Sequence, residues 1–277
     1  MSSRKRLADI LTWLLGFLIV LFAVFPILWA FLTSIKREEA IITRVMQYIP
    51  QEVTFENYVA IWTRSNFPTL LTNSVVVTAL TTVICAVIGT LASYAIARFQ
   101  FRGRRELMLF YLVIRMFPAV MIIIPLFILM RNLGLLDSRL GLALAYTTFL
   151  LPVFIWMMKG FFDAIPLELE DAARIDGCSR IGAMVRVILP LVVGGLTATT
   201  VFVAIGAWNE FLFALMMTTS TGSRTWPVGL QLMVGEFQLP WGSLAAGGII
   251  SIIPVILLFA LVQRALVRGL TAGAVKG

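Results

Sequence analysis

The stretch Phe161–Leu191 reads FFDAIPLELEDAARIDGCSRIGAMVRVILPL, and it is a polar, charged segment between long apolar ones. In the whole chain of 277 residues, 60% are hydrophobic and only 13% are charged. Soluble domains are typically about 45–50% apolar and about 25% charged. A chain of this composition belongs mostly in lipid, which excludes a soluble enzyme, a disordered tail and a fibrous repeat.

The polar stretch predicts two short helices joined by a sharp turn at the inner membrane surface. Pro166 suits the start of the first helix, and the acidic residues that follow favour its positive end. Gly177 suits a left-handed turn that ends this helix, and Ser179 can cap the second helix. An amphipathic hairpin lying on the membrane is one interpretation. The small pair Ala172-Ala173 next to the turn instead favours a partner that packs closely over the bend.

Six apolar stretches on the two sides of this segment are long enough to cross a membrane, which takes about 20 residues. They predict an all-α fold, a polytopic membrane protein with six transmembrane helices and a short cytoplasmic helix, formed by residues 1–277 as a single transmembrane domain. The predicted spans are about 10–33, 70–97, 107–130, 140–162, 187–217 and 243–263, and the long cytoplasmic loop is 163–186.

The distribution of lysine and arginine predicts the orientation of the spans. With the N-terminus inside, 14 basic residues fall on the inner side and 7 on the outer side, while Arg115 falls within a span. Positively charged loops stay on the cytoplasmic side, so both termini are predicted to be cytoplasmic. The segments 34–69, 131–139 and 218–242 are then external. The first span follows Arg4-Lys5-Arg6 and is predicted to be a retained signal anchor.

Several kinds of chemistry lack the residues that they need. The chain has no histidine, which excludes imidazole catalysis and histidine-ligated metals. No lysine stands in a phosphate-binding P-loop pattern, and no Gly-x-Ser-x-Gly nucleophile motif occurs. We therefore predict no catalytic residue, no metal site and no cofactor bound by this chain. The net charge of +8 reports membrane topology rather than nucleic-acid binding.

The polar stretch also carries a recognisable motif. Asp171-Ala172-Ala173-x-x-Asp176-Gly177, followed by Val187-Ile188-Leu189-Pro190, resembles the EAA motif of the permease subunits of binding-protein-dependent ABC importers. The motif begins with glutamate in the family, where this chain has Asp171 preceded by Glu170, and Val187 replaces an isoleucine. Both changes are conservative.

Other segments resemble the carbohydrate-uptake branch of this family, and in particular the second permease of maltose-type transporters. They are Asn73-Ser74, Leu91–Arg98, Pro118 with Pro125, Trp208-Asn209-Glu210-Phe211 and Gly269–Gly273. The resemblance implies a permease that moves a sugar or related carbohydrate by alternating access and is not itself an enzyme. The resemblance makes 1–277 a single transmembrane permease domain, 163–186 its cytoplasmic coupling loop, and the short helix in that loop a coupling helix. The docking site for the ATPase would consist of Glu170, Asp171, Ala172, Ala173, Asp176 and Gly177.

The same resemblance implies the partners and the location. The partners are a second homologous permease subunit, two cytoplasmic ATP-binding subunits, an extracytoplasmic solute-binding protein and the lipid bilayer, with no nucleic acid. ATP and Mg would be bound by the partner ATPase. The chain would lie in the cytoplasmic (inner) membrane of a prokaryote as a multi-pass protein.

Polar groups inside predicted spans are the candidate solute contacts, because a charge in hydrocarbon is costly and usually functional. Asn209 and Glu210 can exchange hydrogen bonds with sugar hydroxyls, and the indole of Trp208 can cover an apolar sugar face. Arg115 favours a gate or a helix lock, and Asn73 can line a cavity. The competing interpretation of Trp208–Glu210 is an aromatic anchor at the membrane interface with a structural carboxylate.

Alternatives to sugar import remain open at this point. Within the same family, the solute could be an amino acid or a peptide. A secondary transporter could use Glu210 and Arg115, although no internal repeat is evident and the EAA-like loop would then be unexplained. A membrane scaffold that transports nothing would have no need of charges inside its spans. Co-purification with an ATPase subunit separates the first interpretation from the last two.

Overall fold

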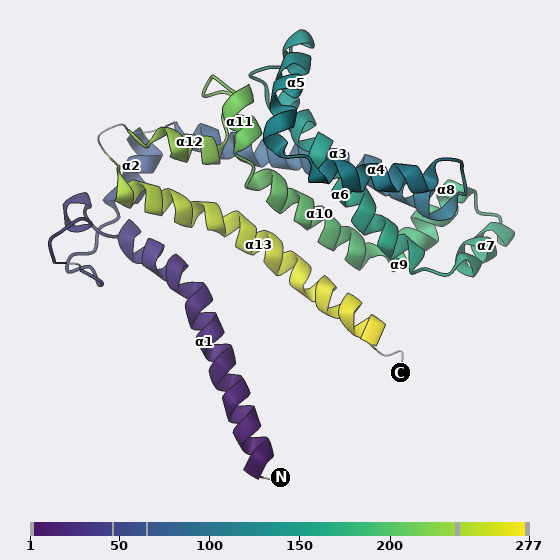
Figure 1. The fold of residues 1–277 in the computed structure, drawn as a ribbon, viewed down its shortest axis with the longest axis horizontal. Coiled ribbons are helices and arrows are strands. Elements are labelled where there is room, and N and C mark those ends of the chain that lie inside the picture. The colour runs from purple at the N-terminus through teal and green to yellow at the C-terminus, as the bar shows by residue number, and fades with distance from the viewer. Residues whose placement is uncertain (1–2, 46, 65, 236–238, 275–277) are drawn as a thin grey trace. The chain divides into compact units, whose positions relative to one another are not determined.

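A computed structural model describes the backbone of residues 3–45, 47–64, 66–235 and 239–274, and their side chains except those of 3–8, 64, 115 and 264–274. Within these residues every regular element is a helix (Figure 1), which confirms the predicted all-α class. In chain order the elements are α1 (Ser3–Ser34), η1 (Glu38–Ala40), α2 (Glu56–Arg64), α3 (Phe67–Arg98), α4 (Arg104–Met116), α5 (Ala119–Asn132), α6 (Arg139–Asp163), α7 (Leu167–Ile175), α8 (Arg180–Ala183), the π-helical turn η2 (Met184–Ile188), α9 (Leu189–Leu191), α10 (Val193–Trp208), α11 (Leu212–Met217), α12 (Trp226–Leu232) and α13 (Trp241–Ala274).

The chain divides into two compact units. The first comprises residues 1–67 and 230–254, and the second comprises 68–229 and 255–277. The second unit contains α3 to α11 and the largest group of buried side chains. That the two units together form a single permease domain, 1–277, stays a prediction.

Four helices are long and apolar enough to cross a membrane alone, namely α1, α3, α6 and α13. The number rises to six if each of two bent helix pairs counts as one span. The predicted spans 10–33, 70–97, 140–162 and 243–263 each lie within one of the four long helices. The other two predicted spans are broken.

The predicted third span, 107–130, is not one helix. It consists of α4 and α5, which meet at an angle of 103°, and Figure 1 shows α5 turning sharply away from α4. The break lies at Phe117, whose backbone is extended (φ −72°, ψ 128°) and precedes Pro118. A proline ring disfavours the helical conformation of the residue before it, so the helix ends there.

The predicted fifth span, 187–217, is interrupted twice. The segment Arg180–Leu191 meets α10 at an angle of 82°. Pro190 has no N–H to donate, and the turn before it is wider than an α-helical one, with the Leu189 N–H bonded to the Met184 carbonyl. α10 then ends at Trp208, and α11 begins only at Leu212. Asn209 and Glu210 therefore lie at a helix break and not on a continuous helix as expected.

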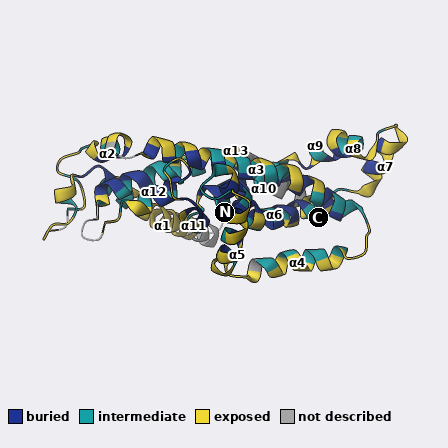
Figure 2. Ribbon diagram, turned by 90° about the horizontal axis from the view of Figure 1, so that it is seen from above, coloured by how far each residue is buried: buried dark blue, intermediate teal, exposed yellow. Residues whose placement is uncertain are grey.

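Small residues let the helices of the second unit approach closely. A Cβ atom added to Gly89 of α3 would lie 2.3 Å from the Phe154 ring of α6, and one added to Gly195 of α10 would lie 2.3 Å from the Phe161 ring. Close approach at small residues is the main source of helix packing in lipid. Tyr146, Phe154 and Phe162 of α6 are fully buried. The described side chains of α1 are mostly exposed (Figure 2).

Candidate functional site: the α7–α8 element and the end of α3

The turn between α7 and α8 has the predicted left-handed geometry. Gly177 has a φ of +91°, and no atom lies within 4 Å of the Cβ that another residue would add there. The Cys178 N–H donates to the Ala173 carbonyl (3.0 Å), and the Gly177 N–H donates to the Arg174 carbonyl (3.1 Å). These two bonds form a Schellman motif, which satisfies carbonyls at the end of α7.

The second helix begins as its sequence predicts. The Ser179 hydroxyl accepts a hydrogen bond from the Gly182 N–H (3.1 Å), which caps α8. Pro166 directly precedes α7, and the first turn of α7 carries Glu168 and Glu170. The α7–α8 element, residues 167–183, is therefore two short helices around a tight turn.

The predicted docking residues divide into two sets by exposure. Asp171, Ala172, Asp176 and Gly177 are exposed, whereas Glu170 and Ala173 are buried. Asp171 forms a long, exposed ion pair with Arg174 (3.8 Å), which contributes little to stability. A partner subunit can therefore contact the exposed set directly, whereas the two buried residues contact only other parts of this chain.

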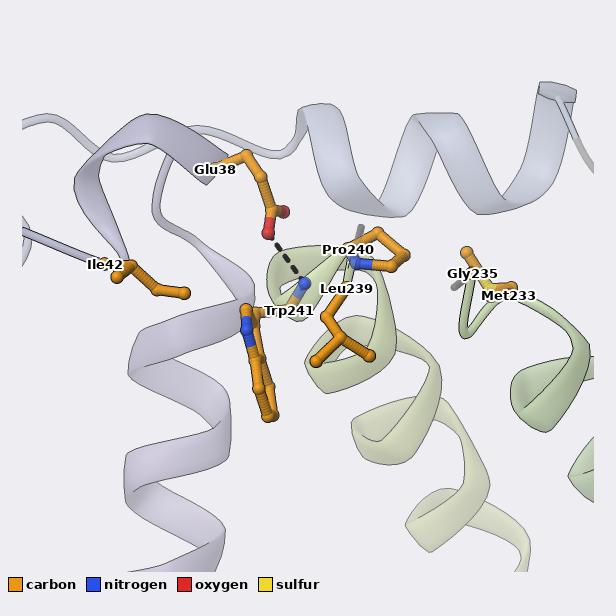
Figure 3. Close-up of a pocket in the computed structure, with 7 residues that line it drawn as sticks. All are labelled: Glu38, Ile42, Met233, Gly235, Leu239, Pro240 and Trp241. Carbon is orange, nitrogen blue, oxygen red and sulfur yellow. Dashed lines mark hydrogen bonds between the residues drawn. The ribbon is translucent and has the colours of Figure 1, made fainter. Parts of the chain in front are cut away.

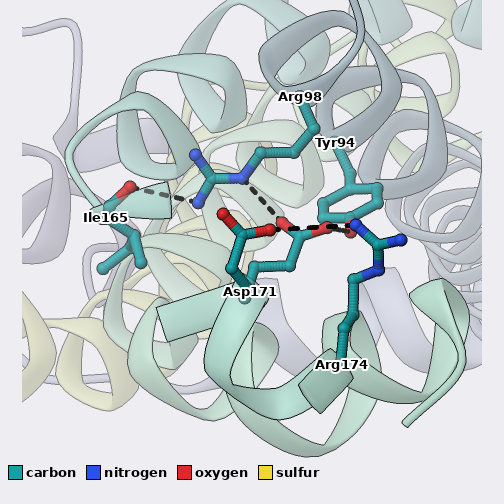
Figure 4. Close-up of polar contacts among 6 residues, drawn as sticks. Tyr94, Arg98, Ile165, Asp171 and Arg174 are labelled. Carbon is teal, nitrogen blue, oxygen red and sulfur yellow. Dashed lines mark hydrogen bonds and ion pairs between the residues drawn. The ribbon is translucent and has the colours of Figure 1, made fainter. Parts of the chain in front are cut away.

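The Glu170 carboxylate is held inside the chain by the end of α3, whose side chains Tyr94 and Arg98 are labelled in Figure 4. One oxygen accepts a hydrogen bond from the Tyr94 hydroxyl, and the other lies 3.1 Å from Nε of Arg98. A second nitrogen of Arg98 donates to the Ile165 carbonyl (3.1 Å). The side chains of Arg98 and Glu170 are only 5% and 10% exposed, so the pair is screened from solvent.

Sequence reasoning missed the roles of Tyr94 and Arg98. Sequence analysis identifies Arg98 only as one of the basic residues on the inner side and, together with Tyr94, as part of the family-like segment Leu91–Arg98. A weak signal was present, because Glu170 and Ala173 are three residues apart and share a helix face. The partner of Glu170 lies far earlier in the chain, and no local pattern identifies it.

Among the described side chains, the predicted solute contacts Asn73, Trp208, Asn209 and Glu210 have different surroundings. Asn209 is exposed and donates to the Ile205 carbonyl (3.0 Å), while Trp208 is buried. Asn73 is fully buried and donates to the carbonyls of Thr221 (2.9 Å) and Arg224 (2.7 Å). It thus fastens α3 to the segment before α12. Arg115 belongs to α4, but its side chain lies outside those described.

Glu210 has a structural task at the helix break. Its carboxylate accepts hydrogen bonds from the backbone N–H groups of Phe213 (2.9 Å) and Ala214 (3.2 Å), at the start of α11. A negative charge stabilises the positive end of a helix. The buried side chain of Tyr146 lies beside this carboxylate, and the buried side chain of Thr225, to which sequence analysis gave no role, lies beside Tyr146.

A second acidic residue, Asp137, ties the loop before α6 to the loop after α11. One carboxylate oxygen accepts hydrogen bonds from the N–H groups of Thr219 (2.8 Å) and Ser220 (2.9 Å) and from the Ser223 hydroxyl. Desolvation alone would raise the pKa of Asp137, but these hydrogen bonds outweigh it and hold the pKa well below its usual range. Asp137 also has a positive φ of 54°.

The first unit has a surface hollow of about 580 Å³ (Figure 3). Glu38 lies in its wall and accepts hydrogen bonds from the N–H groups of Trp241 (2.7 Å) and Gly242 (3.0 Å), at the start of α13. The hollow belongs to segments 34–69 and 218–242, which are predicted to be external. Its lining residues are Glu38, Ile42, Met233, Gly235, Leu239, Pro240 and Trp241.

Comparisons with known proteins agree with the motif in the α7–α8 element. Residues 86–272 match the model of the family described as binding-protein-dependent transport system inner membrane component. The chain is 42% identical to the trehalose transport system permease protein SugB of Mycobacterium tuberculosis, over 94% of this chain and 95% of that protein. It is 36% identical to the trehalose/maltose transport system permease protein MalG of Thermococcus litoralis, over 94% of each chain.

A solved structure agrees as well. A chain of a bacterial ABC transporter involved in the import of the acidic polysaccharide alginate matches with a TM-score of 0.81 and 26% identity. The match covers 95% of the present chain and 98% of the other.

Proposed function

Because this chain belongs to the family of binding-protein-dependent transport system inner membrane components, we propose that it is the permease subunit of an ATP-driven importer and carries a carbohydrate across the membrane. The chain is a multi-pass protein of the prokaryotic inner membrane and works with a solute-binding protein. It is a transport subunit, and ATP hydrolysis takes place in a separate ATPase subunit. The trehalose and maltose permeases among its relatives support the choice of a carbohydrate.

The proposed assembly contains this chain, a second homologous permease, two ATP-binding subunits and an external binding protein. ATP and Mg are bound by the ATPase subunits. Both termini and the loops 98–106 and 163–186 face the cytoplasm, as the lysine and arginine bias predicts. The external loops then lie on the side from which the binding protein delivers the solute.

One observation supports the docking part of the proposal, namely the exposed bend of the α7–α8 element. Asp171, Ala172 and Gly177 are exposed around a turn of fixed backbone geometry, and Ala172 and Gly177 have little bulk. A cleft in an ATPase subunit can close over such a turn without steric conflict. When ATP closes the ATPase dimer, the element is pulled with it, and the attached spans change between inward and outward access.

Substitution of Gly177 tests the docking site. Gly177→Val places a β-branched residue at positive φ, at a cost of about 1–3 kcal/mol, whereas Gly177→Asn is a matched control because asparagine tolerates this conformation. The assay is ATP hydrolysis stimulated by the loaded binding protein in the purified complex. We expect the valine variant to lose most of this stimulation and the asparagine variant to retain it. Full stimulation in both variants would contradict docking at this turn.

The carbohydrate is tested separately. The binding protein that stimulates the complex is screened by thermal shift against sugars, amino acids and peptides. We expect stabilisation by a mono- or oligosaccharide. Stabilisation by amino acids or peptides alone would contradict the proposal of a carbohydrate solute. It would not contradict the proposal that the chain is an importer subunit.

A further inference from the structure

The end of α3 contacts the α7–α8 element on both sides of its turn. Tyr94 and Arg98 bind Glu170 of α7, and Arg98 also binds the Ile165 carbonyl just before α7. Beyond the turn, the Arg180 guanidinium of α8 lies over the ring of Phe99, 5.0 Å from its centre. Three polar contacts and one cation–π contact therefore join one helix end to both short helices.

We propose that Tyr94, Arg98 and Glu170 form a latch that makes α3 and the α7–α8 element move as one body during transport. This inference rests on the proposed function, because it assigns these side chains to the transmission of force from the docked ATPase. They are positioning residues, since none of them lies on the exposed face that an ATPase would touch. The latch makes α3 the span through which movement of the docking element first reaches the membrane.

The chemistry of the latch suits this role better than apolar packing does. Apolar contacts are non-directional and allow one helix to slide over another. Glu170 is held from two directions, by a hydroxyl on one oxygen and a guanidinium beside the other. The hydrogen bond from the Tyr94 hydroxyl to the carboxylate is charge-assisted and directional, and the ion pair with Arg98 beside it is strengthened where water is excluded. Sliding of α7 along α3 would leave a buried charge without a partner, so the two elements remain in register.

Other charged pairs near this element lack these properties. The Asp171–Arg174 pair lies within α7, and its side chains are 68% and 45% exposed. The Lys159–Asp163 pair links residues four apart near the end of α6. Each joins two residues of a single helix, so neither can transmit movement from one element to another. Lys159 is therefore a suitable control position.

The test measures the number of solute molecules transported per ATP hydrolysed. Complexes with Arg98→Ala, Glu170→Ala, both changes together, Arg98→Lys or Lys159→Ala are placed in proteoliposomes with the loaded binding protein. We expect each alanine change in the latch to lower the ratio by about tenfold while ATP hydrolysis continues, as for a typical coupling between sites. The double variant should be no worse than either single one, Arg98→Lys should restore part of the ratio, and Lys159→Ala should leave it unchanged.

Two results would overturn the latch. One is an unchanged transport-to-ATP ratio in the alanine variants. The other is a parallel loss of assembly, hydrolysis and uptake, with a normal ratio in the complexes that remain, since this is the behaviour of a purely structural ion pair. If the alanine variants yield no complex at all, Tyr94→Phe decides, because it removes a single hydroxyl. A lowered ratio in that variant supports the latch, and a normal ratio rejects it.

The wild-type complex separates this inference from the function on which it rests. A wild-type chain that neither assembles with an ATPase nor supports sugar uptake would reject the proposed function. A wild-type complex that couples normally, with latch variants that also couple normally, would reject the latch alone.

Discussion

At the residue scale, the surroundings of Glu210 are compatible with both of the interpretations that sequence analysis treated as alternatives. Its carboxylate accepts hydrogen bonds from two backbone N–H groups of α11, so it has a structural role. It also lies beside the hydroxyl-bearing side chain of Tyr146, which in turn lies beside Thr225, and such hydroxyl groups are typical of a polar pathway. A carboxylate that caps a helix at a break inside a membrane protein can still offer free lone pairs to a solute hydroxyl.

Two substitutions of Glu210 separate these roles. Glu210→Gln keeps an acceptor oxygen for α11, and Glu210→Ala removes it, at a cost of about 0.5–2 kcal/mol for a lost cap. We expect both variants to lower sugar uptake and only the alanine variant to lower the melting temperature of the purified chain markedly. Uptake and thermal unfolding are measured on the same preparations. Full uptake by both variants would remove Glu210 from the solute path and leave it as a structural carboxylate.

Asp137 gives a prediction about pH. Its pKa is lowered in the folded chain, so the stability that it contributes is complete above its unfolded pKa of about 3.9 and is lost as the pH falls through the folded value. Asp137→Asn keeps the positive φ accessible but removes the charge, and it should lower the free energy of unfolding by about 1 kcal/mol. The difference in melting temperature from wild type should stay constant between about pH 5 and 8. A difference that disappears within this range would show that the carboxylate is not held ionised by these hydrogen bonds.

At the scale of helices, apolar length was predictable because partition into lipid depends mainly on composition. The breaks were harder to predict, because prolines occur in intact and in broken helices alike. Pro26, Pro152 and Pro254 lie inside the continuous helices α1, α6 and α13, whereas a break occurs at Pro118. Whether a proline breaks a helix depends on whether its neighbours satisfy the freed carbonyl, and this depends on tertiary packing.

The candidate site shows the same division between local and distant causes. The turn at Gly177 and the cap at Ser179 could be predicted, because both follow from a few adjacent residues. The burial of Glu170 could not be predicted, because its partners Tyr94 and Arg98 come from another helix. An acidic residue at the start of a helix is typical of exposed helices, and here this local preference was misleading about the direction of the side chain.

The contact between α10 and α6 gives a prediction at this scale. Gly195→Ala adds a Cβ 2.3 Å from the Phe161 ring, which must move, and we expect a loss of about 1–3 kcal/mol from overpacking. Gly160→Ala is the matched control, because Gly160 is exposed in α6 with no atom within 4 Å of the added Cβ. It should be neutral or stabilising by up to about 1 kcal/mol. Thermal unfolding in detergent measures both, and equal melting temperatures for the two variants would contradict the close packing.

For the whole molecule, the orientation in the membrane can be tested with the chain's own cysteines. Cys85 is buried, whereas Cys178 is partly exposed next to the α7–α8 turn, in a loop that is predicted to be cytoplasmic. In a Cys85→Ala background, an impermeant thiol reagent should leave Cys178 unlabelled in intact cells and should label it in inverted vesicles stripped of ATPase. A cysteine placed at Thr219 in a chain without Cys178 should show the reverse pattern. Labelling of Cys178 from outside would overturn the topology.

The exposed surface of α1 has a consequence for the way in which the chain is made. None of its most apolar stretch is buried, whereas more than half of that of α6 is buried and includes polar side chains such as Thr147. We therefore expect α1 to insert stably into lipid on its own as it leaves the ribosome, whereas α6 needs neighbouring helices to cover its polar side chains. A nascent chain stopped after α1 should already resist alkaline extraction from membranes, and one carrying α6 as its only apolar helix should be extracted. The first helix thus commits the polypeptide to the bilayer before any of the transport machinery has been synthesised.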